Sequence, residues 1–321
     1  MARSIFALLV VFLLLGLAPW PATGQGPPTP EAPSAVEMTD ESHRLLAQHA
    51  AQSHGLDATF VAWIGTGAYD EDHCAFDPYP VCIPWVPSGW HSWDPDTGKW
   101  WTDPFIWPDF GSGLVRANGL FLKALEEYEA GDAEATYRYL GRAVHMLGDM
   151  ATPAHVHLDT HLPPFDMDPY EQWLNADDRA NTRAWIAAHP AGPAWDLAFT
   201  DLPTWPELDA DLQGQLDSAS QAYGGRGSGR ELWQLGPEGI DAVVFRLMFL
   251  MAETADNWDS DDATGEQFPG GLDDPAYLSG MRDTLFPSLV PYSAALIDYF
   301  EWRAAICPEC TVLLPLVLGG E

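Results

Sequence analysis

The chain has 321 residues and carries 47 acidic against 14 basic side chains, which gives a formal net charge of −33 at pH 7. Such an acidic surface repels nucleic acid and anionic membranes at long range, more weakly as salt screens it. A protein that tracks a nucleic-acid backbone usually needs basic residues, so this composition disfavours nucleic acid as the main partner.

The first residues predict a secretory signal peptide. Arg3 precedes an unbroken apolar run from Ile5 to Leu17, which is short for a membrane span, and small residues follow it. The proline-rich stretch after it predicts a disordered lead-in. We therefore expect a secreted or otherwise extracytoplasmic monomer in four parts: a signal peptide at 1–24, a lead-in at 25–36, a helical domain at 37–306 and a C-terminal tail at 307–321.

Helical periodicity dominates the domain, and no stretch alternates convincingly at period two, so we predict an all-α, multi-helix fold. Thr39 is a suitable N-cap, Gly131 and Asp132 are typical of a turn between two helices, and Pro169 suits a first helical turn. The predicted helices are residues 39–52, 112–130, 133–150, 169–188, 236–257 and 275–306.

Two segments lack this periodicity. Residues 65–110 are rich in Gly, Pro, Asp and Trp and predict a long irregular loop, which its many tryptophans indicate is ordered. Residues 258–274 predict an acidic loop. A calcium site is conceivable there, but no EF-hand register fits, so a solvated loop is the preferred interpretation.

The four cysteines fall into two local pairs, Cys74 with Cys82 and Cys307 with Cys310. In an exported protein, disulfides are the expected state of such pairs. Four thiolates on a zinc ion are the alternative, although the spacing of the first pair fits no common zinc knuckle.

The densest group of ionisable side chains lies in residues 145–161, which hold four of the ten histidines. His145 and Asp149 are four apart and share one helical face. Pro153 interrupts the helix and His155 follows, which gives the spacing H-x3-D-x5-H. Imidazole and carboxylate together are ligands that suit zinc.

A histidine on an apolar helical face is more often a core residue than a ligand, so the pair alone is weak evidence. Bunched ionisable groups beside apolar helices are costly unless a cation compensates them, which favours a metal. Gly141 and Gly148 on the same helix leave room for another element to approach. Further candidates follow in the next residues: His157, Asp159, His161 and Glu171.

In these motifs the chain resembles the zinc-dependent phospholipases C, whose relatives include single-strand-specific nucleases. The resemblance covers residues 39–175. It is carried by His145, Gly148, Asp149, Pro153 and His155 in the helix motif, by HSWDPDTG from His91 after GAYDED at 67–72, by SHRLLA around His43, and by Tyr170-Glu171. It implies two or three zinc ions. The ligands it implies are Asp72, His91, His145 and Asp149 for one ion, His155, Glu171 and a further ligand for a second, and His43 with Asp149 for a third.

The chain departs from the family pattern at two points. The family completes its third zinc with the backbone amine of an N-terminal tryptophan, and no tryptophan lies near a plausible cleavage site here. Met167 stands where the family has a histidine. His161 is the best substitute, with His157 and Asp159 behind it. Asp70 competes with Asp72, which is the better positional match. The remaining histidines are interpreted as structural or surface residues: His49, His54, His73 and His189.

The resemblance implies a hydrolase that cleaves phospholipid or other phosphoesters, with Asp72 as the general base. Tyr69, Trp90 and Trp93 are candidates for an aromatic cage around a quaternary ammonium group, although such tryptophans also often pack against one another. Lipid contact would be transient and made by the domain's own surface. A nuclease and a non-catalytic secreted zinc-binding module are the alternatives.

Overall fold

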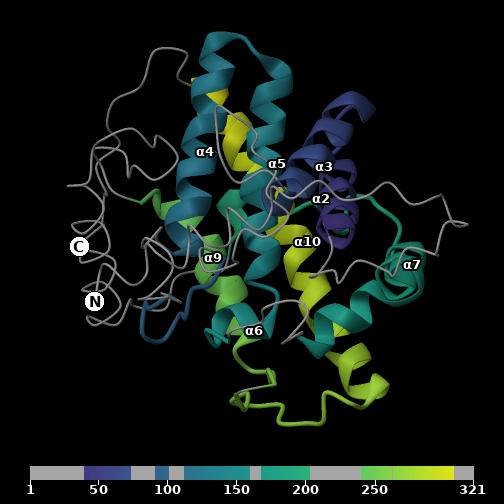
Figure 1. The fold of residues 1–321 in the computed structure, drawn as a ribbon. Helices are drawn as coiled ribbons and strands as arrows, with labels where there is room; N and C mark the ends of the chain where they lie inside the picture. Colours follow the sequence, from purple (N-terminus) through teal and green to yellow (C-terminus); the bar gives the residue numbers. More distant parts are fainter. Residues whose placement is uncertain are drawn as a thin grey trace, which may run out of the picture. The chain divides into compact units, whose positions relative to one another are not determined.

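The computed structural model describes residues 40–73, 91–100, 112–159, 168–202, 240–261 and 263–306. Their only β-pairing is an isolated bridge between Trp258 and Phe268, so the predicted all-α fold is confirmed for this part of the chain (Figure 1). Its helices are α2 (Asp40–Ser53), α3 (Ala58–His73), α4 (Gly113–Ala130), α5 (Ala133–Asp149), α6 (Pro153–Val156), α7 (Pro169–Ala188), α9 (Ala242–Ala255) and α10 (Pro275–Ile306), with a 3₁₀ turn η2 (Phe199–Asp201).

The helix ends follow from local capping chemistry. The side chain of Ser112 accepts a hydrogen bond from the amide of Val115 at the start of α4, and Asp132 caps α5 in the same way. Between these helices Gly131 has φ of 81°, a left-handed conformation that glycine adopts without a steric penalty. The predicted turn between two antiparallel helices is therefore present.

Helix α3 was not predicted from the sequence, and the prediction of a long loop over residues 65–110 is wrong at its start, because residues 65–73 belong to this helix. Gly67 lets α3 pack directly against α5, since a Cβ atom there would lie 1.9 Å from the carbonyl oxygen of Arg138. Tertiary packing thus overrides the low helix propensity of glycine. Residues 91–100 are irregular as predicted, and 74–90 and 101–110 lie outside the described residues.

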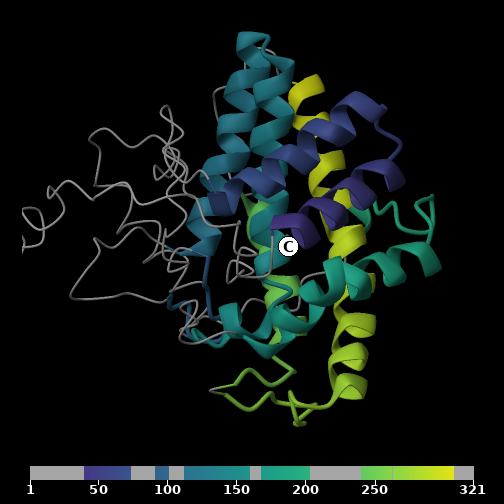
Figure 2. The same ribbon diagram turned by 45° about the vertical axis from the view of Figure 1, so that its right-hand side comes forward.

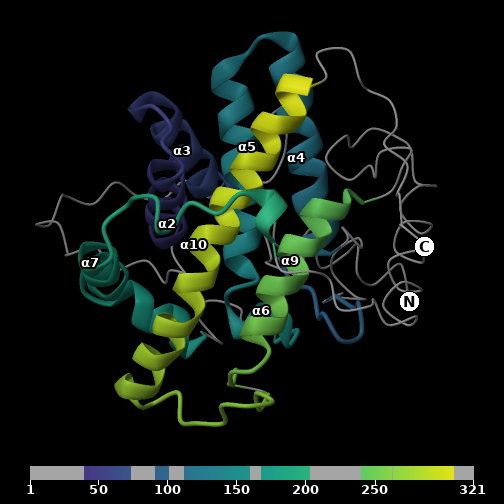
Figure 3. The same ribbon diagram turned by 180° about the vertical axis from the view of Figure 1, so that it is seen from behind.

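Helix α5 lies at the centre of the described helices and contacts α2, α3, α4, α9 and α10. Figure 1 shows α5 between α3 and α4, and Figure 3 shows α10 crossing the opposite side of α5. The long α10, in yellow-green, also runs past α2 and α7 (Figure 2). The lower end of α5 is consequently surrounded by protein, and its last turn is where the ionisable residues gather.

The predicted acidic loop is irregular over its described residues, 258–261 and 263–274. The carboxylate of Asp259 accepts hydrogen bonds from the amides of Gly265 and Gly270, at 2.7 and 2.8 Å. Trp258 stacks on Phe268 with 4.7 Å between ring centroids. In the part of the chain that the structure describes, no helix combines the length and the apolar character that a membrane crossing requires.

Candidate metal centre

The last two turns of α5 supply the centre of the site. His145 and Asp149 are completely buried and, being four residues apart, lie on one face, with 3.4 Å between Nε2 of the histidine and Oδ1 of the aspartate. The Nδ1 atom of His145 donates to the carbonyl oxygen of Ala68 on α3, at 2.7 Å. This bond places a proton on Nδ1 and turns Nε2 toward the carboxylates, where it can hold either a second proton or a metal cation.

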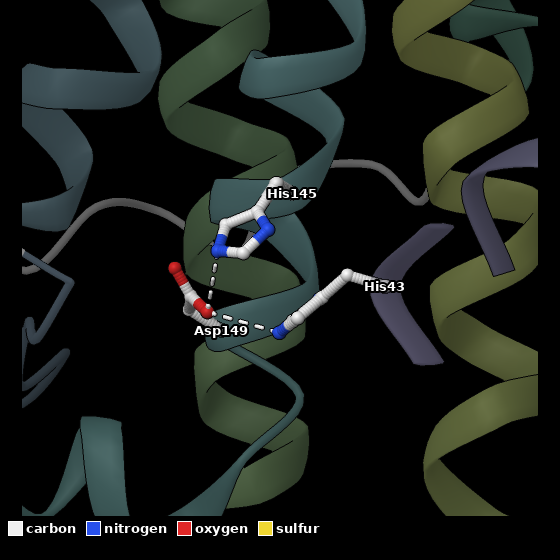
Figure 4. A group of neighbouring side chains, drawn as sticks. All are labelled: His43, His145 and Asp149. Carbon is white, nitrogen blue, oxygen red and sulfur yellow. Dashed lines mark ion pairs between the residues drawn. The ribbon is translucent and has the colours of Figure 1, made fainter. Parts of the chain in front are cut away.

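Helix α2 brings His43 to the same carboxylate. Its Nε2 lies 3.3 Å from Oδ1 of Asp149, and its ring centroid is 4.0 Å from that of His145. Figure 4 shows both rings directed at Asp149. Gly148 makes this approach possible, because a Cβ atom there would lie 2.4 Å from Nδ1 of His43.

The end of α3 and the segment before α4 add two further groups. Oδ1 of Asp72 lies 3.2 Å from Nε2 of His145 and 3.6 Å from Nδ1 of His91. His91 Nδ1 is also 3.1 Å from Oδ2 of Asp149. Asp70, the competing acid, pairs with Arg138 instead, so the structure brings Asp72 and not Asp70 to this site.

His155 and Glu171 complete the group. Because α5 ends at Asp149 and Pro153 starts α6, the chain turns back and carries Nε2 of His155 to 3.9 Å from Oδ1 of Asp149. The same nitrogen is 3.4 Å from Oε1 of Glu171 in the first turn of α7. Asp168 caps that helix by accepting from the amide of Glu171, at 2.8 Å.

Two buried atoms in this group favour a cation-binding site. Nε2 of His145 and Oδ2 of Asp149 are buried without a well-aligned hydrogen bond, although Nδ1 of His91 lies 3.1 Å from the aspartate oxygen. Leaving such groups unsatisfied is costly, and here their lone pairs converge with those of other imidazoles and carboxylates. Two residue triplets place their potential ligand atoms within 4.8 Å of one another: His43, His145 and Asp149, and Asp72, His91 and His145. Nitrogen and oxygen ligands of this kind fit zinc.

The protonation of the site depends on burial and on the carboxylates. Burial lowers the pKa of His43 well below its ordinary value and also lowers the pKa of His91, so both rings are neutral and able to bind a metal. Burial also lowers the pKa of His145, but Asp149 and Asp72 raise it more, to well above its ordinary value. A proton and a metal cation therefore compete for the same position.

Several predicted residues lie elsewhere. Nε2 of His157 is 2.8 Å from the carbonyl oxygen of Trp258, and its Nδ1 is 3.3 Å from Asp256, so this ring is bonded to the end of α9. Trp93 is only 3 % exposed and packs on Phe245, which places it in the core and not in an open aromatic cage. Tyr69 on α3 is 37 % exposed. Outside the described residues lie His161, Met167, Trp90 and the four cysteines, Cys74, Cys82, Cys307 and Cys310.

Of the histidines interpreted as structural, the three whose side chains are described lie outside the site. His49 is buried with its ring edge against Trp185. His54 pairs with Asp196 and Glu301, which lie after α7 and on α10. His189 stacks on Trp185 at the end of α7, while the side chain of His73 is not described.

Three buried charged residues next to the site escaped the sequence analysis. Glu71 accepts hydrogen bonds from Nε of Arg116 on α4 and from Nε of Arg142 on α5. Burial raises the pKa of Glu71, but the two guanidinium groups lower it more, to about 2. The available signal was the placement of Arg138 and Arg142 four residues apart, one turn before the helix motif.

A second group of acids converges near the acidic loop. Asp96, Asp256 and Glu266 place carboxylate oxygens within 4.8 Å of one another. Burial and these neighbouring acids raise the pKa of Glu253 to about 7. Asp96 and Glu266 are exposed, so water can solvate them, in agreement with the preferred interpretation of a solvated loop.

Comparison with known proteins gives a distant structural likeness. The structure is similar to that of the alpha toxin from Clostridium absonum, with a TM-score of 0.47 and 13 % sequence identity, over 87 % of this chain and 67 % of the toxin chain. No family model matches the sequence, and no curated protein matches it either. What this site can do must therefore follow from its own side chains.

Proposed function

We propose that this protein is a zinc-dependent phosphoester hydrolase of the phospholipase C type. The observation that carries the proposal is that four imidazoles surround the buried carboxylate of Asp149. Ring nitrogens from four separate parts of the described chain lie 3.1–3.9 Å from the oxygens of Asp149, namely those of His43, His91, His145 and His155.

The side chains divide into overlapping ligand sets. Asp72, His91, His145 and Asp149 would hold one zinc ion, while His155 and Glu171 would contribute to a second. Zinc ions held there would polarise a phosphoryl oxygen and lower the pKa of a water molecule, which is chemistry suited to phosphoester cleavage. His43 with Asp149 would contribute to a third ion, as the family resemblance implies.

Asp72 is the proposed general base. Its side chain is 10 % exposed, against 1 % for Asp149, so it is the more open of the two aspartates. Asp149 has its oxygens among four imidazoles, whereas Asp72 lies at the end of α3 and can face a water molecule. A carboxylate in this position can accept the proton that the attacking water loses.

The proposed substrate class is a phospholipid with a cationic head group. A formal net charge of −33 favours a cationic ligand over a polyanionic nucleic acid, and the partly exposed Tyr69 lies on α3, the helix that carries Asp72. Secretion, the two disulfides, a monomeric state and transient contact with a membrane surface remain predictions from the sequence.

The test is to measure zinc content and hydrolysis of a chromogenic phosphorylcholine ester on the same preparation. We expect at least two zinc ions per chain, and activity that a chelator abolishes and zinc restores. His145→Ala should lower zinc content and activity, whereas His189→Gln, a histidine outside the site, should change neither. Asp72→Asn should reduce turnover more than zinc content.

Other outcomes would reject the proposal in distinct ways. Cleavage of single-stranded DNA but not of the ester would indicate a nuclease. Tight zinc binding without either activity would indicate a non-catalytic zinc-binding module. A wild-type protein without zinc affinity would reject the metal centre itself.

A further inference from the structure

The three consecutive acids at the end of α3 have three different sets of partners. Asp70 pairs with Arg138, Glu71 with Arg142, and Asp72 with His145. All three of these partners lie on α5. The partners on α5 thus appear in the same order as the acids on α3.

Glu71 is the most completely enclosed of the three. Its side chain is fully buried, and its two oxygens accept separately from Arg116, which is also fully buried, and Arg142, which is nearly so. Because the two arginines come from α4 and α5, one carboxylate joins three helices. Charge-assisted hydrogen bonds on both oxygens leave this side chain little freedom to rotate.

The position needs such a restraint. Negative charges at the C-terminal end of a helix are unfavourable with the helix dipole, and the last turn of a helix readily frays. α3 ends at His73, directly after Asp72. Without compensation by cations, the turn that carries Asp72 would be the least stable part of α3.

We propose that Glu71 is a positioning residue for the metal centre: its ion pairs with Arg116 and Arg142 fix the last turn of α3 in place. Restraining Glu71 from two sides restrains the direction of the adjacent Asp72. It also restrains the carbonyl group of Ala68, three residues earlier, which orients the imidazole of His145. This inference rests on the metal centre of the proposed function.

The test compares Glu71→Gln with Asp70→Asn, a neighbouring acid that makes an ion pair between the same two helices. Zinc affinity is measured by competition with a chelating dye, and Co²⁺ is substituted to record its visible absorption spectrum. We expect Glu71→Gln to weaken zinc binding by about 10–100-fold and to shift the cobalt bands, as the loss of an orienting partner does. Asp70→Asn should weaken zinc binding by less than about threefold and leave the spectrum unchanged, because its partner Arg138 is 42 % exposed.

Equal zinc affinity and equal cobalt spectra for wild type and folded Glu71→Gln would overturn the inference, as would equal losses in the two variants. If Glu71→Gln does not fold, Glu71→Asp keeps the charge but withdraws the carboxylate by one methylene. That variant should then bind zinc more weakly than wild type, and unchanged affinity would overturn the inference. A wild type that binds zinc but hydrolyses no phosphoester would reject the proposed function while leaving this comparison valid.

Discussion

Replacing Gly67 by Ala tests the contact on which the site depends. A Cβ atom at this position would lie 1.9 Å from the carbonyl oxygen of Arg138, whereas ordinary van der Waals contact begins at 3.4 Å. Helices α3 and α5 would therefore have to separate locally by roughly 1.5 Å. Overpacking against a backbone atom costs about 3 kcal/mol, the upper end of the usual range.

Helix propensity alone predicts that Gly67→Ala raises the free energy of unfolding. In an exposed helix interior, exchange of Gly for Ala stabilises by about 1 kcal/mol. If packing dominates, the net loss of about 2 kcal/mol should lower Tm by roughly 4–8 °C in a domain of this size. Separation of the helices should also weaken zinc binding, because Ala68, the next residue, accepts the hydrogen bond that orients His145.

The assay is thermal unfolding followed by circular dichroism, together with zinc competition, on the metal-free and zinc-loaded protein. Gly192→Ala is the matched control, because a Cβ atom at Gly192 has no neighbour within 4 Å. It should leave Tm and zinc affinity unchanged. A Gly67→Ala protein that is as stable as wild type and binds zinc equally well would refute the close approach of α3 and α5.

Three further predictions concern charged side chains that are not proposed ligands. Glu301, and after it Asp196, raise the pKa of His54 to about 9 against the effect of burial. The protonated imidazole therefore stabilises the fold fully below about pH 6.5, and this stabilisation is lost as the pH rises through 9. Unfolding of His54→Gln should show a loss of stability at pH 6 that is absent at pH 10, and a constant loss would contradict it. Burial, followed by neighbouring acids, raises the pKa of Glu253 to about 7, so its ionisation destabilises the fold as pH rises above 4.5. Because the side chain still reaches water although its surroundings partly desolvate it, Glu253→Gln should gain at most about 1 kcal/mol at pH 8 and nothing at pH 4, and an equal gain at both would contradict it. Asp168→Ala should lower the free energy of unfolding by about 1 kcal/mol, whereas Asn, which keeps the N-cap, should not.

Helix positions with local signals were predictable from the sequence. Pro169 at the first turn gave α7 its correct start, and α4 ends before the turn at Gly131 while α5 begins after it, as expected. Helix α3 was not predicted, and its second half was assigned to a loop because Gly65, Gly67 and three consecutive acids are typical of a loop. Their helical conformation depends on partners in α2, α4 and α5, which no local pattern reveals.

In the candidate site, too, only the residues that are close in sequence could be brought together by local reasoning. His145 and Asp149 were brought together by helical spacing alone, which sequence reasoning uses directly. The identity of the other ligands depended on a family resemblance. Arg116 and Arg142 lie 45 and 71 residues from Glu71, and helical spacing places Arg142 on the face of the site but does not show which acid it pairs with.

One face of α5 links the stability of the fold to the metal centre. Arg138, Arg142, His145 and Asp149 recur at helical spacing, and the first three face acids at the end of α3. A slip of α3 by one residue would move it by about 1.5 Å and break all three pairings together. The charges that set the packing register therefore also set the ligand geometry. Zinc that binds only this register must stabilise it by mass action, so the rise of Tm with zinc concentration measures how closely folding and metal binding are coupled.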